Sequence, residues 1–193
     1  MVRHATCAHI DDTLLGRAVD APLDARGAMQ ARALAERLRC ETPLRIECSP
    51  RRRTLQTALA IANGAHCGMR VAAPLDELDF GDWAGRSFAQ LEGDRRWQSW
   101  NRDRDHACTP AGVGIRTLQH SVGRYLATLA ATCAGATLVL VTHAEIIRAI
   151  ALHCLGAPAS DYPQIAIDPA SVTRLCADAA GMRIEAVNEP ASP

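Results

Sequence analysis

The chain has 193 residues, a length typical of one globular domain, and its formal net charge at pH 7 is +0. A neutral chain gives no electrostatic reason to expect binding to nucleic acid or to an acidic membrane surface. All 21 Lys and Arg residues are arginines. This excludes a lysine Schiff base and a Walker-type phosphate lysine, so any anion site must use arginine, histidine or backbone N–H groups.

The eight cysteines form no C-x-x-C pair, and most of them stand in apolar stretches, as Cys48 does. We therefore expect free, buried thiols rather than a metal site or a disulfide framework. The sequence shows neither an apolar signal segment at its N-terminus nor a run of transmembrane length. These features predict a cytoplasmic protein with no metal, no cofactor, and neither nucleic acid nor membrane as a partner.

Taken in chain order, the hydrophobic pattern predicts strands and helices that alternate. After a very short apolar segment at Val2, helices are expected at 23–40, 49–64, 87–100, 115–132 and 145–155, and strands at 44–48, 69–73, 137–141, 171–176 and 182–187. Such alternation predicts a three-layer α/β/α fold with a mostly parallel central sheet, closed by a late hairpin. We expect a single domain over residues 1–193, with a cap or insert around 80–114.

Residues that often begin or end helices predict the limits of the second helix. Ser49 is expected to be its N-cap, with Pro50 at the first helical position. Asn63-Gly64 is expected to end it, because glycine is frequent just beyond a helix. The continuous apolar run of residues 137–141 is typical of a strand buried on both faces.

Histidine and arginine follow three of the predicted strands. Arg3 and His4 follow the first apolar segment, Arg53 lies in the first turn of the helix after the second strand, and His143 follows strand 137–141. The carboxyl ends of parallel strands form the ligand site in open α/β folds, and helix N-termini there favour anions. These residues therefore predict a positive pocket, whose charge and hydrogen-bond donors suit a phosphate group.

Four motifs in this sequence resemble those of the histidine phosphatase (phosphoglycerate mutase-like) superfamily, in the same order and spacing. They are Arg3-His4-Ala5 for R-H-G, residues 49–58 (SPRRRTLQTA) for S-P-x-x-R-x-x-Q-T-A, residues 75–85 (LDELDFGDWAG) for L-x-E-x-x-x-G-x-W-x-G, and His143 at the end of a late strand. Within the superfamily, residues 78–83 and 15–23 are similar to the branch that contains α-ribazole phosphatases.

The resemblance implies a metal-independent phosphomonoesterase that acts on a small phosphorylated metabolite through a phosphohistidine. His4 would be the nucleophile, while Arg3, Arg53 and His143 would hold the phosphate oxygens. Glu77 would protonate the leaving group, with Asp76, Asp79 and Asp82 as alternatives for this role. His143 thus belongs to both the catalytic and the phosphate-binding residues.

The sequence departs from the family pattern at Ala5, at Cys7 and Ile10, and at Glu145, which would put a carboxylate near the anion site. A methyl group at position 5 is tolerable if φ is negative there. Two other functions therefore stay open: phosphoryl transfer of the phosphoglycerate mutase type, and phosphate binding without catalysis. The oligomeric state, monomer or homodimer, also stays open.

Overall fold

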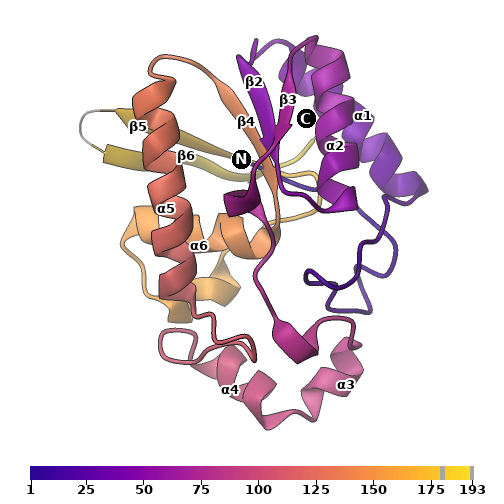
Figure 1. Ribbon diagram of the computed structural model, residues 1–193, viewed down its shortest axis with the longest axis vertical. Helices are drawn as coiled ribbons and strands as arrows, with labels where there is room; N and C mark the ends of the chain where they lie inside the picture. Colours follow the sequence, from indigo (N-terminus) through magenta and orange to yellow (C-terminus); the bar gives the residue numbers. More distant parts are fainter. Residues whose placement is uncertain (179–180, 192–193) are drawn as a thin grey trace.

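The structure is a computed structural model that describes residues 1–178 and 181–191. Within this part of the chain, a six-stranded sheet has the order β3-β2-β4-β1-β5-β6 (Figure 1). The strands are β1 (Val2–Arg3), β2 (Arg45–Cys48), β3 (Met69–Val71), β4 (Leu138–Thr142), β5 (Val172–Asp178) and β6 (Gly181–Glu189). Strands β1 to β4 are parallel to one another, β5 pairs with β1 in the antiparallel direction, and β6 pairs with β5 as an antiparallel hairpin.

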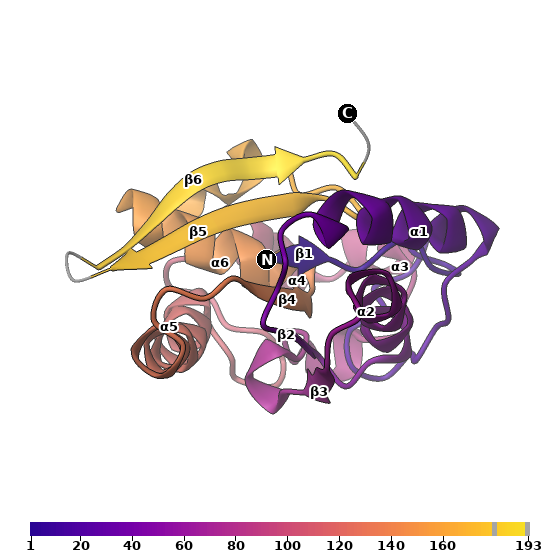
Figure 2. The ribbon, with the colours of Figure 1, turned by 90° about the horizontal axis from the view of Figure 1, so that it is seen from above.

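The helices form layers on both faces of this sheet, with α1 and α2 on one face and α5 and α6 on the other (Figure 2). The helices are α1 (Ala25–Arg39), α2 (Arg52–Ala65), α3 (Phe88–Glu92), α4 (Arg95–Arg102), α5 (Ile115–Thr132) and α6 (Ala144–Leu155). Short 3-10 helices are η1 (Ala73–Leu75), η2 (Gly81–Trp83) and η3 (Ala159–Gln164). The predicted three-layer α/β fold with a mostly parallel sheet is confirmed.

Strand β4 divides the core into two clusters because its side chains alternate between the faces of the sheet. Val139 and Val141 pack with residues of α1 and α2, and Leu140 packs with residues of α5 and α6. β4 lies between β2 and β1, with Val2 of β1 paired to Val141. This register brings the carboxyl ends of β1 and β4 together, and there the backbone N–H of His4 donates to the carbonyl of Thr142 at 3.0 Å.

The predicted limits of α2 are wrong at both ends. The helix begins at Arg52, and its N-cap position is held by Arg51 without a side-chain hydrogen bond. It continues to Ala65, and His66 takes the left-handed conformation that ends it. Gly64 serves packing rather than termination, because a Cβ there would come within 2.9 Å of the Ala35 side chain on α1.

Three further expectations need correction. Residues 87–100 form two helices, since Asp94 accepts hydrogen bonds from two backbone N–H groups and starts α4 anew. Strand β3 ends at Val71, before the turn of η1, and both hairpin strands are longer than expected. The 3-10 helix η3 was not expected, because nothing in its sequence has helical periodicity.

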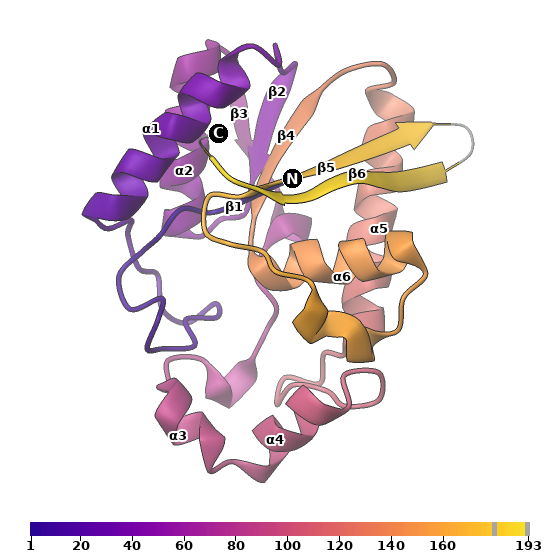
Figure 3. The same cartoon turned by 180° about the vertical axis from the view of Figure 1, so that it is seen from behind.

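The elements between η2 and α5 lie away from the sheet. Helices α3 and α4 are separated from the strands and stand beyond one end of the sheet (Figure 3). Trp83 and Trp100 of this region are fully buried, and Trp97 packs edge-to-face on Trp83 at a ring separation of 5.2 Å. The region therefore has its own aromatic packing.

All eight cysteines are free, as the spacings predict, but only Cys7 and Cys48 are buried. Cys40 and Cys108 are exposed and the other four are partly exposed, so the expectation of generally buried thiols is wrong. An apolar sequence context does not guarantee burial, because it does not say which face of an element points inward. Across residues 1–178 and 181–191, every helix is too short or too polar to cross a membrane.

Candidate active site

The structure brings together the five residues singled out from the sequence. Arg3 ends β1 and His4 follows it, Arg53 lies in the first turn of α2, and His143 stands between β4 and α6. Glu77 follows η1, on the chain that leads away from the sheet. The convergence has a simple cause: β1, β2 and β4 are parallel neighbours, so the residues that follow them meet at one edge.

His4 is held as a neutral imidazole with one free nitrogen. Its Nδ1 lies 2.8 Å from the carbonyl oxygen of Ala5, which can only accept a hydrogen bond. Nδ1 therefore carries the hydrogen and Nε2 carries the lone pair. Burial, and then the charges of Arg53 and Arg3, hold the pKa of His4 well below its usual range.

Two arginines next to His4 each have a buried N–H group without a hydrogen-bond partner within residues 1–178 and 181–191. Arg53 is 1% exposed and donates through Nη2 to Gly16 at 2.9 Å, and Arg3 donates through Nη1 to Ile167 at 2.6 Å. In both side chains the buried Nε–H has no hydrogen-bond partner among the described residues. A buried donor without a partner is costly, and an anion bound between these guanidinium groups would remove that cost.

Glu77 is a carboxyl group whose proton is poised for exchange near neutral pH. Its Oε1 accepts the backbone N–H of Leu78 at 2.9 Å, while Oε2 lies 3.4 Å from Nδ1 of His143 and 3.9 Å from Nη2 of Arg53. Burial is the largest cause that raises the pKa of Glu77, to about 7, and Arg53 opposes it. A carboxyl group of this kind can give or take a proton at neutral pH.

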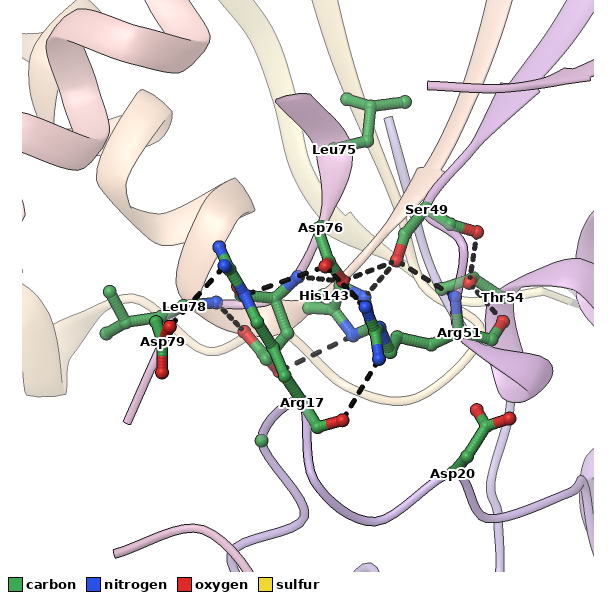
Figure 4. Close-up of polar contacts among 12 residues, drawn as sticks. Arg17, Asp20, Ser49, Arg51, Thr54, Leu75, Asp76, Leu78, Asp79 and His143 are labelled. Atoms are coloured by element: carbon green, nitrogen blue, oxygen red, sulfur yellow. Dashed lines mark hydrogen bonds and ion pairs between the residues drawn. The ribbon is translucent and has the colours of Figure 1, made fainter. Parts of the chain in front are cut away.

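His143 is fully buried beside these groups and links them to a second network (Figure 4). Its Nε2 lies 2.7 Å from Oγ of Ser49, and its Nδ1 lies 3.3 Å from Nη2 of Arg53. The ring meets that of His4 edge-on, with the ring centres 5.3 Å apart. Burial, and then Arg53, lower the pKa of His143 well below its usual range, so the free site contains two neutral histidines.

A cavity of about 280 Å³ opens onto Arg3, His4, Arg53 and Glu77. Its apolar lining includes Ile10, Leu14, Phe80, Phe88 and Trp97, and its polar lining includes Thr13, Arg104, Glu145, Arg148 and Tyr162. A larger hollow of about 320 Å³ lies at the amino end of β4, and none of the five site residues lines it. We therefore place the candidate active site in the smaller cavity.

Four polar residues of this cavity were missed by sequence reasoning: Thr13, Arg104, Arg148 and Tyr162. Arg104 lies 3.8 Å above the ring of Tyr162, and Arg148 donates to the Tyr162 hydroxyl at 3.0 Å. Arg148 could have been found, because it stands four residues after Ala144 and hence on the same face of α6. Arg104 and Tyr162 lie in segments whose sequences carry no signal of their position.

The departures from the family pattern have local partners in the structure. Nη1 of Arg104 pairs with Glu145 at 3.2 Å, so the carboxylate expected to oppose an anion is compensated. The Ala5 N–H donates to the hydroxyl of Thr57 at 3.1 Å, and Ala5 is not among the residues with positive φ. Cys7 is buried, and burial raises its pKa to about 11, which keeps the thiol neutral. Ile10 lines the cavity and adds an apolar surface.

In the described part of the chain, no group of three or more His, Cys, Asp or Glu side chains could hold a metal ion. The cationic groups of the site are the arginines, in keeping with a sequence that lacks lysine. A phosphate group would thus meet guanidinium and imidazole donors.

The mostly parallel sheet, with His4 and His143 at its carboxyl edge, has the α/β fold of the phosphoglycerate mutase-like proteins. Residues 1–190 match the histidine phosphatase superfamily (branch 1), and the chain belongs to this family. The resemblance of the four motifs is therefore confirmed over almost the whole chain.

Similar proteins in the family include two phosphatases and a probable phosphoglycerate mutase. The chain is 28% identical to an adenosylcobalamin/α-ribazole phosphatase of Escherichia coli (strain K12) over 171 residues, 87% of this chain and 84% of that protein. It is 28% identical to a probable phosphoglycerate mutase of Enterobacter over 179 residues, 91% of this chain and 82% of that protein. It superposes on a mycobacterial glucosyl-3-phosphoglycerate phosphatase with a TM-score of 0.86 and 26% identity, covering 98% and 97% of the two chains.

Proposed function

We propose that this protein is a metal-independent phosphomonoesterase that forms a phosphohistidine on His4 and hydrolyses a small phosphorylated metabolite. The observation that carries the proposal is the free Nε2 of neutral His4 next to two arginines with unpaired buried N–H groups. A nucleophile, an anion clamp and a carboxyl group with a pKa of about 7 are the parts that this reaction needs.

In the first step, Nε2 of His4 attacks phosphorus in line with the ester oxygen. The N–P bond forms, the P–O bond to the alcohol breaks, and Glu77 donates its proton to the departing oxygen. Arg3, Arg53 and His143 stabilise the negative charge that spreads over the other phosphate oxygens.

In the second step, the Glu77 carboxylate accepts a proton from a water molecule that attacks phosphorus. The N–P bond breaks, inorganic phosphate leaves, and His4 returns to its neutral form. Glu77 ends protonated, ready for the next turnover. The cycle needs no metal ion, because the arginines supply the positive charge.

The substrate class follows from the size and lining of the cavity. A volume of about 280 Å³ suits a small phosphorylated metabolite, and Phe80, Phe88 and Trp97 offer an apolar wall to its non-phosphate part. We propose that residues 80–114 act as a cap that selects this part. Relatives named for α-ribazole phosphate and for glucosyl-3-phosphoglycerate define the first compounds to test.

The decisive experiment is a panel of phosphomonoesters, including α-ribazole phosphate, assayed with EDTA present. We expect phosphate release that EDTA does not reduce. A parallel assay for the interconversion of phosphoglycerates separates a mutase from a phosphatase. Binding of phosphate without turnover of any compound would support a site that has lost catalysis, and loss of activity in EDTA would contradict a metal-independent reaction.

A further inference from the structure

The imidazole of His143 is held at both nitrogens, and the two contacts together indicate where its hydrogen lies. On one side, Nε2 lies 2.7 Å from Oγ of Ser49, and this hydroxyl lies 3.2 Å from Oδ1 of Asp76 (Figure 4). On the other side, Nδ1 lies 3.3 Å from a guanidinium nitrogen of Arg53.

Asp76 is an acceptor that its ion pair with Arg51 holds in place. Its two carboxylate oxygens receive Nε and Nη2 of Arg51 at 2.8 and 2.7 Å, and Oδ1 also receives the backbone N–H of Glu77 at 2.8 Å. A hydroxyl donates more strongly to a carboxylate than to a neutral partner. The single hydrogen of Ser49 therefore goes to Asp76, which leaves the Ser49 oxygen to accept a hydrogen bond from Nε2 of His143.

The Arg53 contact leads to the same assignment independently. A guanidinium group donates and cannot accept, so Nδ1 must offer a lone pair at 3.3 Å from it. The Glu77 oxygen 3.4 Å from Nδ1 is also compatible, since a protonated carboxyl group can donate to that lone pair. The hydrogen of neutral His143 thus lies on Nε2.

We propose that Ser49 and Asp76 are positioning residues that fix the Nε2–H form of His143, so that the site binds an oxyanion with uptake of one proton at Nδ1. This inference rests on the proposed function, because it concerns the same phosphate site. Asp76 acts on His143 through Ser49, and neither Ser49 nor Asp76 is among the residues that line the cavity.

The proton uptake follows from the chemistry of the ring. An anion oxygen beside Arg53 would face a lone pair on Nδ1, which repels it. Taking one proton from solvent turns His143 into the imidazolium, whose Nδ1–H donates to the anion while Nε2–H stays on Ser49. The other charged or titratable groups around the ring are Arg3, Arg51, Arg53, His4 and Glu77.

The neutral alternative would require the Ser49 hydrogen to turn from Asp76 to Nε2. That rotation exchanges a bond to a carboxylate for a bond to a neutral nitrogen, and it is available only where Ser49 is free to rotate. Removing the hydroxyl removes the obstacle, because Nε2 can then stay without a hydrogen while Nδ1–H faces the anion. The proton uptake should therefore depend on Ser49 and on Asp76.

Nitrogen-15 NMR of the histidine rings tests the first half of the proposal on the wild-type protein. We expect the His143 signals of a neutral ring with hydrogen on Nε2 in the free protein, and those of an imidazolium when sulfate is bound. A free ring with hydrogen on Nδ1, or a ring that stays neutral in the sulfate complex, would overturn the assignment.

Calorimetric titration with sulfate tests the second half, because sulfate does not itself change protonation near neutral pH. The His4→Ala/Glu77→Gln background removes two other groups of the site that could take up a proton, the free Nε2 of His4 and the carboxyl group of Glu77. In buffers of different ionisation enthalpy at about pH 7.5, binding should take up about one proton. In Ser49→Ala and in Asp76→Ala on that background, the uptake should fall towards zero. Asp79→Asn, a nearby carboxylate that also pairs with Arg17, is the matched control and should keep the full uptake.

The outcomes separate this proposal from the proposed function. Sulfate binding without proton uptake in the His4→Ala/Glu77→Gln background would contradict the imidazolium at His143. Full uptake in Ser49→Ala would contradict the role of Ser49, and full uptake in Asp76→Ala that of Asp76. Failure of the wild-type protein to bind sulfate would instead count against the anion site, and hence against the proposed function, while NMR of the free protein would still decide the tautomer.

Discussion

The carbonyl oxygen of Ala5 lies 2.8 Å from Nδ1 of the neighbouring His4 and fixes which ring nitrogen can react. His4 and Ala5 are adjacent in sequence. Because the Ala5 carbonyl accepts the hydrogen of Nδ1, the lone pair of the neutral ring lies on Nε2. Because burial and the nearby arginines also keep His4 unprotonated, the nucleophile is ready without a separate base.

Replacing His4 by alanine should abolish turnover, because it removes the free Nε2 that would form the N–P bond. Quenching the wild-type enzyme with alkali during turnover of a phosphorus-labelled substrate should trap phosphohistidine, recognised as acid-labile label on the protein, and the variant should show none. The fold should persist, since His4 follows a strand and Ala5 makes the core contact. Turnover in His4→Ala above a low background would exclude the mechanism.

Arg53→Ala should lower kcat by roughly 10²–10³, the effect expected when one preorganised donor to the transition state is removed. The matched control is Arg52→Ala, which removes the adjacent, exposed arginine and should leave kcat within about twofold of wild type. Steady-state kinetics and thermal unfolding of both variants provide the check. A large increase in KM with kcat unchanged would mark Arg53 as a group that binds the ground state and the transition state equally.

The sequence predicted the layers of the fold because hydrophobic periodicity, and the alternation of strands with helices along the chain, are local signals. It also placed Arg3, His4, Arg53 and His143 near one another, because each follows or begins an element at the same edge of the sheet. The predicted limits of α2 were wrong because the residues taken as its start and stop signals instead make contacts with other parts of the fold. Ser49 bonds His143 and Asp76, and Gly64 lets α1 approach closely.

The outer part of the cavity could not be predicted in this way. Arg104, Glu145 and Tyr162 meet from three separate segments, and their contact depends on how the segment after α4 folds back over α6. Hydrophobic periodicity describes single helices and strands, so it does not predict contacts between separate segments. The pairing of Arg104 with Glu145 explains a residue that looked unfavourable in the sequence, because a carboxylate near an anion site needs a nearby cation.

Glu77→Gln should lose far more activity on an alkyl phosphate than on p-nitrophenyl phosphate. An alkoxide needs a proton as it leaves, whereas a nitrophenolate is stable enough to leave without one. Comparing kcat/KM for the two substrates gives the measurement.

The carboxylates at 79 and 82 provide matched controls for this test. Asp79 lies just before η2 and Asp82 lies within it, and their side chains are 42% and 67% accessible. Asp79→Asn and Asp82→Asn should therefore affect both substrates equally. A selective loss in either of them, or an equal loss on both substrates in Glu77→Gln, would assign the general acid to another residue.

The ratio of kcat/KM for the alkyl phosphate to that for p-nitrophenyl phosphate should fall as pH rises through about 7. Burial raises the pKa of Glu77 from 4.5 to about 7, so its carboxyl group keeps the proton below that pH and loses it above. Only the alkyl substrate needs this proton, and the ratio should therefore drop by up to about tenfold per pH unit above 7. Taking a ratio cancels any proton uptake at His143, which both substrates share.

The acid side of the same profile tests His4. Because the pKa of His4 lies well below 6.5, the nucleophile stays neutral and kcat/KM for p-nitrophenyl phosphate should show no loss as pH falls to about 6. The variant Glu77→Gln is the control for the pH dependence of the substrate ratio. In this variant, the ratio of kcat/KM for the alkyl phosphate to that for p-nitrophenyl phosphate should be low and independent of pH. A wild-type ratio that stays constant between about pH 6 and 9 would show that Glu77 does not donate the proton to the leaving group.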